Sequence, residues 1–109
     1  MITSLKVGQT VLVHSNPKDA AGNGPAPIKP GEFGNTGTQW LPQTSGVVSF
    51  VVSGPEGADA TFTALTVGST VVNISASTLA GVPKQTPFTI NVTVGDLDHF
   101  DPIADPPQG

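Results

Sequence analysis

The chain has 109 residues, the length of one domain, and carries a formal net charge of −4 at pH 7 with four Lys and no Arg. This balance excludes the basic stripe that a nucleic-acid partner needs, and no apolar run approaches the ~20 residues of a membrane-spanning helix. The chain also lacks Cys, which excludes a disulfide scaffold and cysteine-based catalysis. We therefore expect neither nucleic-acid binding nor membrane insertion.

The first half of the chain predicts four short strands and one long loop. The strand segments are rich in β-branched or aromatic residues and are bounded by turn residues. They are Ile2–Lys6, Thr10–Ser15, Thr38–Leu41 and Val47–Val52. Between the second and third lies Asn16–Gly37, which is rich in Gly, Pro and Asn and shows no period. We expect a loop there, longer than compact domains usually carry without a function.

The second half of the chain predicts three more strands by strict alternation of apolar and polar residues. Two alternating runs occupy Asp59–Ser77, separated by a short break at residues 66–68. A third run, Pro87–Val94, places four apolar side chains on one face: Phe88, Ile90, Val92 and Val94. No window shows the apolar spacing of a helix. The sequence therefore predicts an all-β chain.

Seven strands this short need two sheets packed face to face, so we expect an antiparallel β-sandwich of about seven strands. The alternation directs Phe50, Phe62 and Phe88 into the core. We expect Phe62, Val72 and Ile74 to face Trp40 across the sandwich. The sandwich should occupy residues 1–95, and residues 96–109 form an acidic, Pro-rich segment that we expect to be a flexible tail or linker.

Several segments carry a recurring pattern in order: LKVGQTVLV (Leu5–Val13), KDAAGN (Lys18–Asn23), a strand with Trp40, ATFTALTVGSTVVNISAS (Ala60–Ser77) and TPFTINVTV (Thr86–Val94). This pattern resembles the bacterial immunoglobulin-like domains of the group-2 type, found in intimin-like surface proteins and phage structural proteins. The resemblance implies an immunoglobulin-like antiparallel β-sandwich. It carries no shared active site.

The resemblance implies a non-catalytic structural or adhesion module of a bacterial surface protein or phage virion. The residues agree, since the sequence contains no GxSxG elbow and no convincing pair of catalytic carboxylates, so we expect no enzyme. The partner would be another protein, or a further copy in a larger assembly. The N-terminal MITSLKVGQT lacks the pattern of a secretory signal. We therefore expect a location on a virion or at the cell surface, with no signal peptide in this chain.

Two groups of residues are candidates for binding. As an alternative function, the Asn16–Gly37 loop could recognise a cell-surface polysaccharide or a receptor, with Asn23, Phe33 and Asn35 as contact residues. In the tail, Asp96, Asp98 and Asp101 could bind calcium, because clustered carboxylate oxygens are ligands that calcium prefers. The competing interpretation of the tail is a solvated acidic segment that aids solubility. No other cofactor is expected.

Overall fold

The computed structural model describes residues 1–32 and 35–107. Its strands follow the chain as β1 (Ile2–Lys6), β2 (Thr10–His14), β3 (Gln39–Pro42), β4 (Val48–Ser53), β5 (Asp59–Ala64), β6 (Gly68–Ser77) and β7 (Pro83–Thr93). One turn of 3-10 helix, η1 (Pro55–Gly57), joins β4 to β5. The described part of the chain holds no α-helix, as the alternation predicts.

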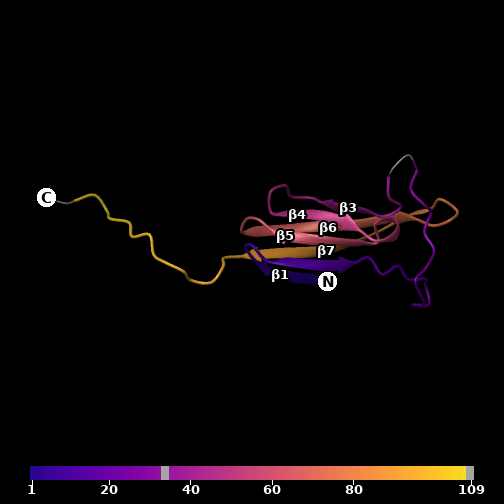
Figure 1. Cartoon of the computed structure of the whole chain (residues 1–109), viewed down its shortest axis with the longest axis horizontal. Helices are drawn as coiled ribbons and strands as arrows, with labels where there is room; N and C mark the ends of the chain where they lie inside the picture. Colours follow the sequence, from indigo (N-terminus) through magenta and orange to yellow (C-terminus); the bar gives the residue numbers. More distant parts are fainter. Residues whose placement is uncertain (33–34, 108–109) are drawn as a thin grey trace.

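The seven strands form two sheets that pack face to face (Figure 1). One sheet has four strands in the order β1-β7-β6-β3, and the other has three in the order β2-β5-β4. Strands β1 and β7 run parallel, with Ile2 beside Thr89 and Lys6 beside Thr93, and every other pair is antiparallel. The predicted all-β sandwich is confirmed.

The core lies between the sheets and is centred on aromatic side chains. Trp40 contacts Phe62 and Phe88 edge to face, with ring centroids 5.9 Å and 6.4 Å apart. Its indole Nε1 donates a hydrogen bond to the Gly57 carbonyl oxygen at 2.8 Å. Alternate residues of the strands, together with Val47 just before β4, complete the buried cluster: Leu5, Val13, Val47, Val48, Ala60, Ala64, Val72, Ile90 and Val92.

Two expectations about the core need correction. Phe50 does point to the core side, opposite Phe62 in the β4–β5 register, but it is 37% exposed. The reason is its position on β4, an edge strand, where the partner sheet does not cover the ring fully. Val72 and Ile74 do not lie across the sandwich from Trp40, because β6 pairs with β3 in the same sheet and places Ile74 directly beside Trp40. Of the three residues expected there, Phe62 alone faces Trp40 from the opposite sheet.

Strand β7 begins four residues earlier than expected, at Pro83 rather than Pro87 (87 − 83 = 4). The Thr89 amide donates to the Met1 carbonyl, toward β1. Because amide directions alternate along a strand, the positions of Pro83 and Pro87 also face that side, where β1 does not reach. The two prolines lack N–H groups, but this interrupts no hydrogen bond between strands, because no strand among the described residues lies on that side of them. Val94, expected to point inward, lies beyond β7 and is exposed.

The segment that follows β7 forms no helix or strand among its described residues and runs away from the sandwich (Figure 1). Lys6, at the end of β1, forms an ion pair with Asp96 at the start of this segment. Across the described residues, no helix has the length and apolar character needed to cross a membrane.

Replacing Trp40 by Phe removes the donor to Gly57 and leaves a buried carbonyl unpaired beside a cavity. We expect Trp40→Phe to lower the free energy of unfolding by about 2–4 kcal/mol. Urea denaturation followed by circular dichroism measures this change. Leu41→Ala, at the exposed neighbouring position, is the control and should change stability by less than about 0.5 kcal/mol. Equal denaturation midpoints for Trp40→Phe and the parent would contradict this account of the core.

Candidate functional site

The Asn16–Gly37 loop is tied to the sandwich by backbone hydrogen bonds. At its start, the Asp19 carboxylate accepts the amides of Ala21 and Asn23, both at 2.9 Å, which closes a tight turn. Further along, the Lys29 amide donates to the Ser77 carbonyl at the end of β6 at 2.9 Å. The Asp19 bonds shape the loop internally, and the Lys29 bond holds it against one end of the sandwich.

Glu56, in the η1 turn, fixes the second half of the loop. Its carboxylate oxygen Oε2 accepts the amides of Gly31 and Gly37, both at 2.8 Å, and its carbonyl accepts the Thr38 amide at 2.9 Å. Glu56 adopts a left-handed backbone with φ of 52°, which is unfavourable for a residue with a side chain. Two hydrogen bonds to the loop and one to Thr38, directly after it, offset this local strain.

The two amide donors lower the pKa of Glu56 below its ordinary value of 4.5, first through Gly31 and then through Gly37, while desolvation acts weakly in the opposite direction. Hydrogen bonds to the ionised form of a carboxyl group stabilise that form. The loop contact is therefore fully formed above the ordinary pKa and is lost as the pH falls through the lowered value.

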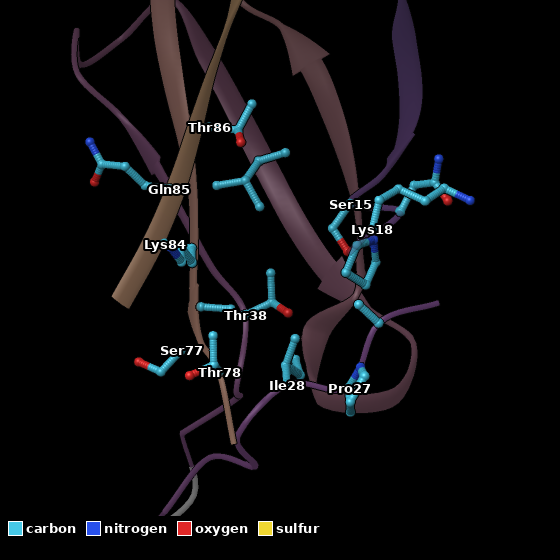
Figure 2. Close-up of a pocket in the computed structure, with 15 residues that line it drawn as sticks. Ser15, Lys18, Pro27, Ile28, Thr38, Ser77, Thr78, Lys84, Gln85 and Thr86 are labelled. Carbon is cyan, nitrogen blue, oxygen red and sulfur yellow. The ribbon is translucent and has the colours of Figure 1, made fainter. Parts of the chain in front are cut away.

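The docked loop encloses a pocket of about 430 Å³ at the end of the sandwich. Figure 2 shows Lys84, Gln85 and Thr86 along β7 on one side, Ser15 and Lys18 on the other, and Thr38 between them. The apolar surface of the pocket comes from both the loop and the strands, and includes Pro17, Ala26, Pro27, Ile28, Ile74 and Ala76.

The lining of this pocket is positively charged in an acidic chain. Two of the four lysines, Lys18 and Lys84, line it, and none of its described lining residues is acidic. Thr38, Ser77 and Gln85 also line the pocket, but Figure 2 shows the Gln85 amide directed away from it. Such a lining suits a small ligand that combines an anionic group with an apolar body. None of the described lining residues is aromatic, so the pocket offers no ring for a sugar to stack on.

Two of the loop residues expected to bind, Asn23 and Asn35, do not line this pocket. Asn23 lies in the Asp19 turn, and the Asn35 amide donates to the Glu32 carbonyl. Phe33 lies outside the described residues. Sequence reasoning missed Lys18 and Lys84, which are far apart in the chain, and Glu56. A carboxylate beside Gly54 and Gly57 in a turn is the only local signal that could have drawn attention to Glu56.

The three tail aspartates contact different partners. Asp96 pairs with Lys6, whereas Asp98 and Asp101 flank His99, with oxygen-to-nitrogen distances of 2.9 Å and 3.5 Å. Within residues 1–32 and 35–107, no group of three or more His, Cys, Asp or Glu side chains lies close enough to hold a metal ion. Calcium binding by Asp96, Asp98 and Asp101 stays a prediction.

Solved structures resemble this fold. No protein-family model matches the sequence, and no curated protein matches it either. The crystal structure of domains 4 and 5 of the S-layer protein SbsC matches with a TM-score of 0.58 and 21% identity, covering 86% of this chain and 41% of that chain. The solution structure of the PKD domain from the KIAA 1837 protein matches with a TM-score of 0.58 and 12% identity, covering 91% and 86%.

Both matched structures are immunoglobulin-like folds, so the chain is an immunoglobulin-like β-sandwich, as expected. At these identities the likeness shows the fold alone. The chain spans 41% of the length of the S-layer structure. Membership of the group-2 bacterial family is not confirmed.

The anchoring role of Glu56 can be tested by pH titration. We expect the amide NMR signals of Gly31 and Gly37 to shift together with a midpoint below 4.5, because protonation of Glu56 weakens both hydrogen bonds. In Glu56→Gln this pH dependence should disappear. Glu32→Gln, a matched change within the loop, should leave it in place. Unchanged titration of both amides in Glu56→Gln would show that another group holds the loop.

Proposed function

We propose that this chain serves as a non-catalytic structural or adhesion module of the group-2 immunoglobulin-like type in a bacterial surface protein or a phage virion. The observation that carries the proposal is the match to an S-layer protein structure over 86% of this chain. A surface or virion location, outside the cell, is part of the proposal.

The connection of the terminal strands supports a structural role. The chain enters the sandwich through β1 and leaves it through β7, and these strands pair in parallel over five residues. Tension between the two ends of the sandwich therefore loads the whole β1–β7 ladder in shear rather than opening it one pair at a time. This arrangement suits a domain that transmits force within an assembly.

The pocket beside the Asn16–Gly37 loop supports a second candidate function, recognition of a cell-surface polysaccharide or a protein receptor. Loops positioned on a rigid scaffold commonly carry recognition, and this one places Lys18 and Lys84 at a shared pocket. The missing aromatic surface weighs against a neutral glycan as ligand. Recognition therefore ranks behind the structural role.

Labelling and binding together test the proposed function. Antibodies against the domain, applied to intact cells and purified particles of the producing organism, should label their surface in immunogold electron microscopy. For a purely structural module, co-sedimentation with intact bacterial cells and insoluble cell-wall polysaccharides, in calcium and in chelator, should show no saturable binding, whereas an adhesion module would bind the cells. Label confined to permeabilised cells would contradict the surface role.

A double variant, Lys18→Gln with Lys84→Gln, separates the two candidate functions. Saturable binding that is lost in this variant, with an unchanged melting temperature, would establish recognition through the pocket. Binding that requires calcium and is lost in Asp98→Asn with Asp101→Asn would instead support the tail site. Isothermal titration of calcium into the domain gives an independent measurement of that site.

A further inference from the structure

Strand β4 is an edge strand without the usual protection against pairing. The other edge strands of the described sandwich each carry a charged, polar ring or interrupting residue: Lys6 in β1, His14 in β2 and Pro42 in β3. Val48–Ser53 reads VSFVVS and contains neither a charge nor a proline. Natural edge strands usually carry such residues because an open edge invites another strand to pair.

The free backbone groups of β4 belong to alternate residues. The Leu65 amide donates to the Val47 carbonyl at 2.9 Å, so Val47, Ser49 and Val51 direct their backbone groups toward β5. Val48, Phe50 and Val52 consequently direct their N–H and C=O groups outward. No strand of the described chain lies on that side of β4.

The side chains along this edge are apolar and partly exposed. Phe50 and Val52 lie on the core side yet are 37% and 36% exposed, and Val51, on the outer face, is 71% exposed. The Phe50 ring stacks on Phe62, with ring centroids 5.6 Å apart, so its position is set by the core. A strand added at this edge would cover Phe50 and Val52 and satisfy the free backbone groups.

The sequence of β4 is complementary to itself in an antiparallel pair. A two-fold axis through Val51 places Phe50 opposite Val52 of the second copy and Ser49 opposite Ser53, and keeps core-side residues opposite core-side residues. Aromatic residues opposite β-branched residues are favourable cross-strand pairs, and no like charges meet. The outward backbone groups of Phe50 and Val52 then pair with each other across the axis.

We propose that β4 is a self-association surface, on which β4 of a second copy of this chain pairs antiparallel and joins the two three-stranded sheets into one. The inference deepens the function proposed above and rests on it for its role, because a structural module in an assembly needs a contact to its neighbour. The contact itself follows from the neutral, self-complementary edge.

Sedimentation equilibrium over a wide range of concentration tests the proposal. The wild-type chain should reach a monomer–dimer equilibrium, and Val51→Lys should weaken it by at least about tenfold, because two like charges would face each other at the axis. Leu12→Lys is a matched control. Leu12 lies on β2 and is 51% exposed. Leu12 and Val51 are both paired with Thr61 of the central strand β5, from opposite sides, so their side chains lie on the same outer face of the sheet.

Charge exchange and hydrogen exchange identify the contact. A mixture of Val51→Lys and Val51→Glu should regain the association that each variant loses alone, with unchanged melting temperatures. The amides of Phe50 and Val52 should gain protection from hydrogen exchange as the concentration of the wild-type chain rises.

Three results would overturn the proposal: a monomer at every concentration, equal weakening by Leu12→Lys and Val51→Lys, or failure of the mixture to recover. None of these results affects the labelling of the surface. Label confined to the interior of cells would contradict the surface role and would leave the proposed dimer untouched.

Discussion

The hydrogen bond from Trp40 to the Gly57 carbonyl connects the parts of this molecule that matter most. Trp40 belongs to the four-stranded sheet, whereas Gly57 ends the turn between β4 and β5 of the other sheet, so this bond joins the two layers inside the core. The residue next to Gly57 is Glu56, whose carboxylate holds the long loop and whose carbonyl accepts the Thr38 amide directly after it. A single turn therefore links core packing to loop position.

This arrangement explains how one end of a small acidic sandwich comes to carry a pocket. The loop lies against β6 through Lys29 and against the turn through Glu56, and the space that it encloses receives Lys18 and Lys84. The opposite property appears at β4, where the core is left partly uncovered and the backbone is open. The molecule thus has one closed, charged end and one open, neutral edge, and these two surfaces support different proposed roles.

Much of the fold follows from local patterns, and much less of the candidate site does. Alternation placed Phe62, Phe88, Ile90 and Val92 in the core, as the structure confirms. The same alternation gave Phe50 the correct face but not its exposure, because parity says nothing about whether a strand lies at an edge. Alternation suggested that β7 starts at Pro87, although prolines whose amide positions face an open edge fit within a strand. The pocket was missed because its lysines come from distant segments.

The sequence by itself determined the number of strands, their faces and the all-β sandwich, because a period of two is a local property that any pleated strand must satisfy. Only the tertiary structure decided which strands form the edges, how Glu56 anchors the loop and where Lys18 meets Lys84. Each of these features depends on contacts between residues far apart in the chain, and no local pattern of apolar and polar residues records such contacts.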